Sequence, residues 1–434
     1  MKRLVNHWPL AGVAVLTVAL AAPPAAPAQP AAFDAPGLRA YVRQVLARNA
    51  GLRATDARVG AAAELIAPAG ALPDPTLSLG VMSVPVTSFD LDREPMTQVP
   101  IIALQQRFPF PGKQLAFAGV ARAESTLAQT SHEVLEAALA AAAARAYYDL
   151  ASARTALAIW RGRVTLAEQA IAVSRVRYET GSAPQTDLLR ARLRRAELEE
   201  EGDALEAALV AAAARADALR AGTGDSIPAP PLVGLGRRAV ISPDPAPPAD
   251  SALRELDVRN PRLREAWQEV ERADLQARVA AIAARPDFTV SLQNGVRLGG
   301  REPFVSVTVG IAVPVWASHK QSPAARAALL DTEAARERYS DLTARLEGEL
   351  AAESAELRAL AARIDLTENE ILPLADGAAA SALARYRVGG VEFTAVLDTQ
   401  DDVFRAELRL ARLVADYGAA RARLAALLGE EWYR

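Results

Sequence analysis

Two kinds of hydrophobic pattern alternate along the chain. Short segments with alternating apolar and polar residues, clearest at residues 305–313, are separated by much longer segments with helical periodicity. The alternating segments come in two pairs with a loop inside each pair, so they predict two β-hairpins, at about residues 75–108 and 287–314. The remaining pattern predicts long helices, so the expected fold class is mainly α with a small β part.

Each predicted hairpin lies between a shorter helix and a very long one. The shorter helices are expected at about residues 37–67 and 251–284. The long helices follow the hairpins and reach Tyr178 and Tyr386, and Pro373 predicts a kink in the second. A helix of about 65 residues is about 100 Å long. Two shorter helices placed end to end have a similar length, so we expect such a pair beside each long helix.

Glycines mark the ends of the two long helices. Gly181 and Gly389 predict tight reversals, because such turns favour positive φ. Return helices are then expected to about residues 220 and 428. Two helix starts carry the pattern of a capping box, Ser182 with Gln185 and Ser318 with Gln321. An acidic loop is expected inside the first hairpin, with Asp90, Asp92 and Glu94.

The same unit occurs twice, about 210 residues apart. Three motifs carry the duplication, and each occurs in both halves: Asn49-Ala50-Gly51-Leu52-Arg53 with Asn260-Pro261-Arg262-Leu263-Arg264, Pro73-Asp74 with Pro286-Asp287, and Arg177-Tyr178-Glu179-Thr180-Gly181 with Arg385-Tyr386-Arg387-Val388-Gly389. A repeat of this length indicates one duplicated α-β-β-α-α unit.

The N-terminus has the pattern of an export signal. Lys2 and Arg3 precede an apolar stretch from Leu10 to Ala22, and Ala26-Pro27-Ala28 is a small-x-small cleavage site. The stretch is short for a retained anchor, which is the alternative. The expected domains are residues 1–28 as a signal peptide, 29–221 as the first repeat with its turn near 181, 222–250 as a Pro/Gly-rich connector, and 251–434 as the second repeat with its turn near 389.

Composition excludes several functional classes. The chain has no cysteine, which rules out a disulfide framework and a thiolate metal site. A formal net charge of −3 does not suggest nucleic acid as a partner. The three histidines, His7, His132 and His319, are far apart, and no nucleophile has a base at a suitable spacing. We therefore expect no enzyme activity, no metal site and no cofactor.

Four strands are too few to close a barrel, and an open sheet would leave its edges unpaired. Several chains that each contribute four strands would solve both problems. The alternation then predicts a lipid-facing set, Phe288, Val290, Leu292, Val305, Val307, Val309, Ile311 and Val313. It also predicts a water-facing set inside the barrel, Thr289, Ser291, Gln293, Ser306 and Thr308. The alternative is a soluble strand domain with Trp316 in its core.

The chain resembles the TolC family of outer-membrane efflux channels over nearly all of the mature sequence. The resemblance rests on the duplicated unit, the Asn-x-x-Leu pairs, Pro73-Asp74-Pro75, the two Arg-Tyr-x-x-Gly turns and the segment Phe108-Pro109-Phe110-Pro111-Gly112-Lys113. That last segment looks most like members that serve heavy-metal efflux pumps. The family implies a homotrimer with a twelve-stranded barrel in the outer membrane and a helical barrel through the periplasm. Its implied partners are a periplasmic adaptor (membrane fusion protein) and an inner-membrane RND-type pump.

The resemblance also assigns roles to individual residues. It places the turns with Tyr178, Gly181, Tyr386 and Gly389 at the periplasmic tip, where the adaptor docks. By position, Thr186, Asp187 and Asp398 match residues of the aperture, whereas Ala395 replaces a second aperture aspartate. Three aromatic residues fall where strands meet helices and are expected at the membrane interface: Phe108, Phe110 and Trp316.

Two functions remain open at this stage. The first is a passive exit duct in the outer membrane that extends into the periplasm, with heavy-metal cations as one candidate substrate class. The second is an exported periplasmic coiled-coil protein with a structural or adaptor role and no membrane barrel. The helical content suits both functions, whereas the strand pattern and the export signal favour the first.

Overall fold

The computed structural model describes residues 37–84, 96–222, 224–230, 232–233, 248–297 and 299–434. The expected signal peptide, the acidic loop with Asp90, Asp92 and Glu94, and most of the connector lie outside these residues. All described residues belong to one compact unit, which spans Phe33–Arg434. None of its described helices is long and apolar enough to cross a membrane.

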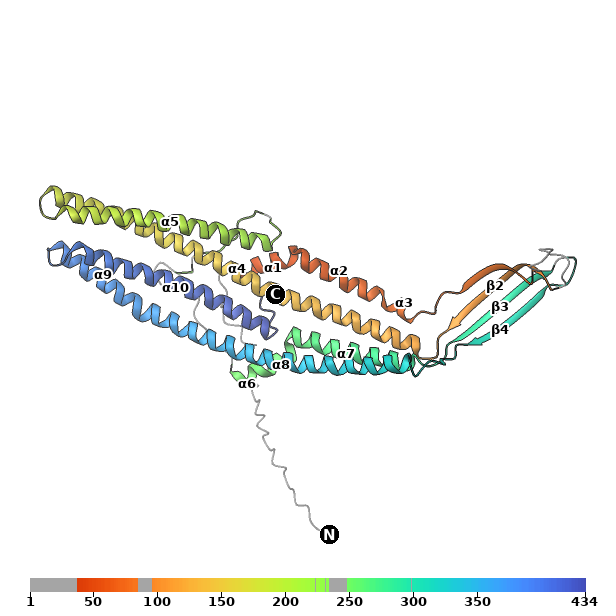
Figure 1. The fold of residues 1–434 in the computed structure, drawn as a ribbon. Helices are drawn as coiled ribbons and strands as arrows, with labels where there is room; N and C mark the ends of the chain where they lie inside the picture. The colour runs from red at the N-terminus through yellow and green to blue at the C-terminus, as the bar shows by residue number, and fades with distance from the viewer. Residues whose placement is uncertain (1–36, 85–95, 223, 231, 234–247, 298) are drawn as a thin grey trace, which may run out of the picture. The chain divides into compact units, whose positions relative to one another are not determined.

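The order of elements is similar in both halves, except that α3 has no counterpart and the second long helix is divided into α8, η1 and α9 (Figure 1). The first half contains α1 (Leu38–Arg48), α2 (Ala50–Glu64), α3 (Ile66–Gly70), β1 (Thr76–Met82), β2 (Gln98–Phe108), α4 (Lys113–Glu179) and α5 (Gln185–Leu219). The second half contains α6 (Ala249–Arg259), α7 (Pro261–Ile282), β3 (Phe288–Arg297), β4 (Phe304–Ile311), α8 (Gln321–Leu366), η1 (Thr367–Ile371), α9 (Leu372–Arg387) and α10 (Phe393–Leu427).

The shorter helix before each hairpin is broken, which the periodicity did not predict. Asn49 separates α1 from α2, and its side-chain oxygen accepts a hydrogen bond from the Leu52 N–H at 3.1 Å. Asn260 does the same between α6 and α7, with the Leu263 N–H at 3.0 Å. The repeated Asn-x-x-Leu motif is therefore a pair of helix N-caps, a position that asparagine favours.

The long second helix is irregular near Pro373, as predicted. Residues Thr367–Ile371 form a short π-helix, and α9 begins at Leu372 directly before the proline. A proline removes one backbone donor, and a π-bulge absorbs the resulting mismatch.

The two predicted capping boxes are absent. At the start of α5, Pro184 occupies the cap position, and the Ser182 hydroxyl instead donates to the Arg177 carbonyl. At the start of α8 the cap position belongs to Lys320, and its side chain makes no capping hydrogen bond. At α5, the Ser182 side chain that could form the cap is already hydrogen-bonded within the preceding turn.

The four strands form one antiparallel sheet in the order β1-β2-β3-β4. Its register places apolar residues opposite one another across all four strands, for example in the row Leu77, Leu104, Leu292 and Val307. The adjacent row on the other face is polar and contains Thr76, Gln105, Ser291 and Thr308. The sheet therefore has one apolar and one polar face, as the alternation predicted.

Helix α4 is the centre of the helical part. It contacts α3 near its start, α2 farther along and α1 near its middle, where Tyr41 packs on Tyr147, and it contacts α5 along its second half and α7 and α10 from the second repeat (Figure 1). Helix α8 has a similar pair of neighbours, α7 and α10. This is the predicted arrangement of two shorter helices beside each long one. Small residues permit the close packing, because alanine is the most frequent residue at the buried positions of α4 and α10.

Candidate functional site

The two helix turns share one backbone geometry. Gly181 and Gly389 have φ of +70° and +75°, in the left-handed region. In each turn the N–H after the glycine donates back to an arginine carbonyl at 2.8 Å, from Ser182 to Arg177 and from Gly390 to Arg385. This is the Schellman arrangement, in which glycine is favoured because a Cβ would be strained.

The two tyrosines of the turns are not equivalent. Tyr178 is 44% exposed, whereas Tyr386 is only 5% exposed. Tyr386 packs against Phe393 with ring centroids 5.3 Å apart, and the Arg177 guanidinium lies 4.4 Å from its ring centre. The first repeat has Gln185 at the position of Phe393, four residues after the turn glycine. The second turn therefore has an apolar partner that buries its tyrosine.

Tyr386 also connects the two repeats. Its hydroxyl donates to Asp187 Oδ2 at 3.3 Å, and Asp187 is 8% exposed in the first turn of α5. Burial raises the pKa of Tyr386 above its ordinary value, and the Asp187 carboxylate acts in the same direction. The phenol therefore stays protonated and can donate at neutral pH. Arg177 adds a second connection through the Tyr386 carbonyl, at 3.2 Å.

The other two residues matched to the aperture lie on the surface. Thr186 and Asp398 are both exposed in the single chain. The structure thus brings Asp187 together with Tyr386, although the family resemblance assigns them different roles. It joins neither residue to Asp398. The feature that could have revealed the contact is Phe393, which replaces a polar residue of the first repeat.

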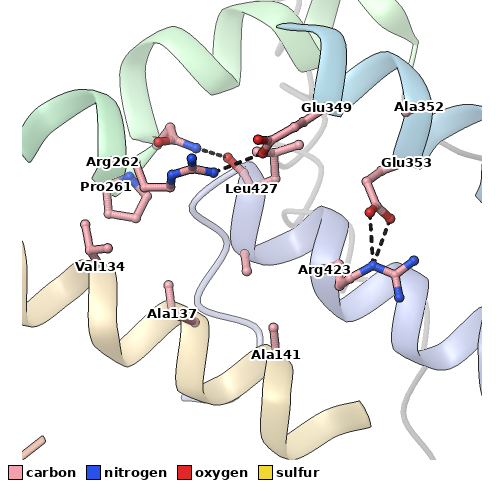
Figure 2. Close-up of a pocket in the computed structure, with 13 residues that line it drawn as sticks. Val134, Ala137, Ala141, Pro261, Arg262, Glu349, Ala352, Glu353, Arg423 and Leu427 are labelled. Carbon is pink, nitrogen blue, oxygen red and sulfur yellow. Dashed lines mark hydrogen bonds and ion pairs between the residues drawn. The ribbon is translucent and has the colours of Figure 1, made fainter. Parts of the chain in front are cut away.

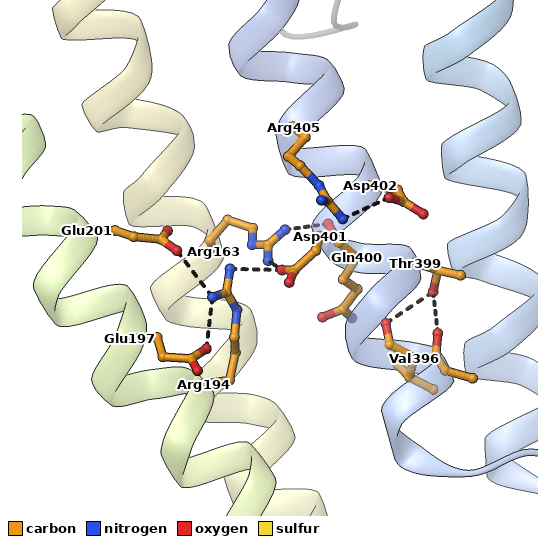
Figure 3. A network of polar contacts seen from close by, with 11 residues as sticks. Arg163, Arg194, Glu197, Glu201, Val396, Thr399, Gln400, Asp401, Asp402 and Arg405 are labelled. Atoms are coloured by element: carbon orange, nitrogen blue, oxygen red, sulfur yellow. Dashed lines mark hydrogen bonds and ion pairs between the residues drawn. The ribbon is translucent and has the colours of Figure 1, made fainter.

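A charged network ties α4, α5 and α10 together farther from the turns (Figure 3). Asp401 of α10 accepts hydrogen bonds from Arg163 of α4 and from Arg194 of α5, the latter at 2.9 Å. Arg194 also pairs with Glu197 and Glu201, at 3.1 and 3.2 Å. Arg194 is one of four arginines close together in α5, with Arg190, Arg192 and Arg195, and it makes an inter-helical contact.

The strand–helix junction contains a second contact between the repeats. Lys113, at the start of α4, donates to Asp287 Oδ1 and to the Arg285 carbonyl, both at 2.7 Å. The Phe110 N–H donates to the same carboxylate oxygen at 3.0 Å. Burial alone would raise the pKa of Asp287, but the Lys113 and Phe110 hydrogen bonds and the nearby cations hold it below its ordinary value. The carboxylate is therefore ionised and joins both hairpins.

Replacing Lys113 with methionine should destabilise this junction. Lys113 and Asp287 have side chains that are 10% and 21% exposed, so the change leaves a mostly buried carboxylate without its cation. We expect a loss of about 2–3 kcal/mol in unfolding free energy, slightly less than for a fully buried pair. Because the pKa of Asp287 is lowered in the folded state, the pair stabilises above the ordinary pKa and its contribution is lost as the pH falls. Denaturation curves of variant and wild type should begin to converge below about pH 4 and should meet once the pH is below the lowered pKa of Asp287.

The three aromatic residues expected at a membrane interface lie near this junction. Phe108 is 39% exposed at the end of β2, and Trp316 is 72% exposed beyond β4. Phe110 is partly buried, with the Arg285 guanidinium 5.0 Å from its ring centre. The exposure of Trp316 contradicts the alternative in which it forms the core of a soluble strand domain.

A pocket of about 370 Å³ lies between α4, α7, α8 and α10 (Figure 2). Its α4 wall is apolar and includes Ala137 and Ala141. The charged groups around it pair with one another, Arg262 with Glu349 at 2.9 Å and Arg423 with Glu353 at 3.0 Å. This pairing favours a role in holding the helices together.

Replacing Gly389 with valine should impair the turn while leaving the sheet intact. A β-branched residue at positive φ is strained by about 1–3 kcal/mol, and the turn has no other feature to absorb this. The efflux that the family resemblance implies should be lost in cells while the amount of protein in the membrane is unchanged, and the same is expected for Gly181→Val. Gly390→Ala is the control, because Gly390 has no positive φ and a Cβ there would meet its nearest atom at 3.4 Å. If all three variants supported as much efflux as the wild type, the shape of these turns would not matter for efflux.

Comparison with known proteins provides the context for this geometry. Residues 252–430 match the family model described as outer membrane efflux protein. No curated protein matches the sequence. Solved structures match almost the whole chain. The outer-membrane channel OprN has a TM-score of 0.75 at 19% identity, with coverage of 93% of this chain and 92% of that one.

Two further solved structures are similar to the same extent. CusC, described in terms of folding and transmembrane channel formation, has a TM-score of 0.76 at 17% identity, covering 91% and 92% of the two chains. The outer membrane protein VceC from Vibrio cholerae has a TM-score of 0.73 at 19% identity, covering 91% and 96%. The family model thus matches the second repeat, and the fold of almost the whole chain is that of these solved outer-membrane proteins.

Proposed function

We propose that the protein is the exit duct of a tripartite efflux system. In this proposal three copies assemble, their twelve strands close a barrel in the outer membrane, and their helices form a tunnel in the periplasm. An inner-membrane RND-type pump delivers the substrate, and a periplasmic adaptor docks at the turns around Gly181 and Gly389. The duct itself carries out no chemistry, and the pump makes the selection.

The observation that carries the proposal is the apolar face of the sheet. Large apolar side chains on all four strands are exposed in the single chain, with exposed fractions from 36% to 72%: Leu77, Leu79, Ile102, Leu104, Val290, Leu292, Val305, Val307 and Val309. A contiguous apolar face of this kind normally meets lipid or another protein. The opposite face is polar, as expected for the wall of a water-filled lumen. A soluble coiled-coil protein, the second candidate, would have no use for this face.

The contacts near the turns support a gate at the other end of the helices. Tyr386, Asp187 and Arg177 connect the α4–α5 turn to the α9–α10 turn within one chain. A set of such connections around a ring would hold the turns together and limit the aperture. Thr186 and Asp398, exposed on the same return helices, are then available to line it.

The substrate class is proposed from resemblance. The Phe-Pro-Phe-Pro-Gly-Lys segment favours heavy-metal cations as cargo. Among the described residues, no cluster of three or more His, Cys, Asp or Glu side chains is arranged to hold a metal ion. Passage of a metal would therefore rely on conduction and on selection by the pump.

The proposal can be tested in a deletion strain. Loss of the protein should sensitise cells to the substrates of its pump, so the strain is challenged in parallel with divalent metal ions and with hydrophobic toxins. Sensitivity to metals alone would support the metal assignment, and sensitivity to toxins alone would replace it. Recovery of the mature protein in the soluble periplasmic fraction would contradict the duct and favour the coiled-coil alternative.

Asp398 provides a narrower prediction about the aperture. Replacing it with alanine should raise single-channel conductance in a planar bilayer, because it would remove a ring of like charges that bind cations at the constriction. Asp402, one turn farther along α10 and paired with Arg405 at 3.0 Å, is a suitable control. Unchanged conductance in Asp398→Ala would remove this residue from the gate.

A further inference from the structure

The junction between the two repeats has a counterpart whose residues are unpaired within one chain. Lys113-Gln114 follows the first hairpin at the start of α4, and Lys320-Gln321 follows the second hairpin at the start of α8. Asp287 precedes β3, and Asp74 precedes β1 at the equivalent position. The pair Lys113–Asp287 is formed, with 2.7 Å between its atoms.

The other two members of this set face solvent. Asp74 and Lys320 are both exposed, and no ion pair joins either of them to another described residue. They lie next to the two outermost strands, because β1 and β4 are the edges of the sheet. Edge strands with free backbone groups pair readily with another chain. If the β4 edge of one copy paired with the β1 edge of a second copy, Lys320 of the first copy and Asp74 of the second would come close together.

The duplication also gives a register for that contact. Phe108 is opposite Phe288 in the β2–β3 pair. In the duplicated unit, Phe108-Pro109 corresponds to Val313-Pro314. Phe288 directly follows Pro286-Asp287 and Pro75 directly follows Pro73-Asp74, so these two residues also correspond. The same pairing would place Val313 opposite Pro75 of a neighbouring copy.

Counting along the antiparallel strands then places Ile311 opposite Leu77 and Val309 opposite Leu79. These residues all lie on the apolar face of the sheet, and they are 55% to 72% exposed in the single chain. A slip by one residue would put apolar residues of one copy on the polar face of the other, which a two-faced sheet disfavours. The register derived from the repeat is thus one that the side-chain pattern permits.

We propose that neighbouring copies are joined by an ion pair between Lys320 and Asp74 of the next copy, with Val309 of β4 opposite Leu79 of that copy's β1. The pair would be the counterpart, between copies, of the Lys113–Asp287 contact within each copy, with Lys320 seven residues after Val313 where Lys113 is five residues after Phe108. The inference rests on the proposed assembly of several chains and adds to it the residues and the register of the seam. The partner is a second copy of this chain.

Cysteine pairs test the register directly, because the chain has no cysteine of its own. Opposite residues on neighbouring antiparallel strands have Cβ atoms about 4.5–5.5 Å apart, close enough for many such pairs to form a disulfide. After oxidation in membranes, the double variant Leu79→Cys with Val309→Cys should give covalent dimers and trimers in denaturing gels. The matched control, Ser78→Cys with Val309→Cys, should stay monomeric because Ser78 faces the other side.

Charge exchange tests the ion pair. Asp74→Lys and Lys320→Asp should each lower the temperature at which the assembly dissociates in detergent, and the double exchange should restore it. Asp56→Lys, an exposed acid of α2, controls for the change in net charge. Failure of the double exchange to restore stability would overturn the ion pair.

The mass of the assembly in detergent distinguishes a failure of the proposed seam from a failure of the proposed duct. A trimer that shows neither the Leu79–Val309 cross-link nor restoration by charge exchange would overturn the proposed seam and leave the duct intact. A cross-link between Leu77→Cys and Val309→Cys instead would overturn the register. A monomer in detergent would count against the proposed function itself. Cross-linking in the predicted register together with restored stability would support the seam.

Discussion

Tyr386→Phe should raise the single-channel conductance of the duct. Cells that carry this variant should also become more permeable to small toxins. The change removes only the hydroxyl that donates to Asp187, and it leaves a buried carboxylate without this donor. A hydrogen bond to a charged group contributes about 1–2 kcal/mol when it is as long as this one. That energy corresponds to a shift of roughly 5–30-fold in the equilibrium between closed and open turns. Planar-bilayer recordings of purified protein would measure the shift.

Its control is the equivalent change in the other repeat. Tyr178 is 44% exposed, and its hydroxyl forms no hydrogen bond to any described residue, so Tyr178→Phe should leave conductance unchanged. Asp187→Asn should resemble Tyr386→Phe, and the double variant should add little because both changes break the same contact. Equal conductance in wild type, Tyr386→Phe and Asp187→Asn would mean that this contact does not hold the turns closed.

Gly418→Leu should prevent stable packing of the two repeats. Gly418 lies in α10 against α4, where an added Cβ would fall 2.3 Å from the Tyr148 ring. Tyr148 is fully buried, so its ring cannot move aside without displacing other core residues. Overpacking of this severity costs about 3 kcal/mol or more. We expect little folded protein in the membrane, measured as the amount of assembled trimer.

The matched control is Gly377→Leu in α9, where an added Cβ meets no atom within 4 Å. Helix propensity favours leucine over glycine by somewhat less than about 1 kcal/mol, so this variant should assemble as well as wild type or better. Normal assembly of Gly418→Leu would show that α4 and α10 are not packed as closely as the structure has them.

Local patterns were sufficient to predict most of the fold. The alternating segments gave the hairpins, and the glycines gave the turns at Gly181 and Gly389, because these signals depend on a few consecutive residues. The helix breaks at Asn49 and Asn260 do not follow from the periodicity, although both residues belong to the repeated Asn-x-x-Leu motif. Periodicity continues across an N-cap, so only the cap hydrogen bond shows that the helix restarts.

Contacts between the repeats could not be predicted in the same way. Tyr386 and Asp187 are 199 residues apart, and Lys113 and Asp287 are 174 apart. The two repeats have similar sequence motifs, but equivalent residues pack differently in the fold. Tyr386 is buried, for example, whereas Tyr178 is exposed. The roles of Thr186 and Asp398 at the aperture, and of Phe108, Phe110 and Trp316 at the membrane interface, remain predictions.

The most direct test of the duct is electrical. Purified wild-type protein and Tyr386→Phe, each confirmed as a trimer in detergent, are inserted into planar bilayers and recorded under the same salt and voltage. We predict discrete channels of one unitary size for each protein, with the larger conductance in Tyr386→Phe. Bilayers that stay silent with both proteins, at protein amounts verified in the membrane, would contradict a transmembrane duct.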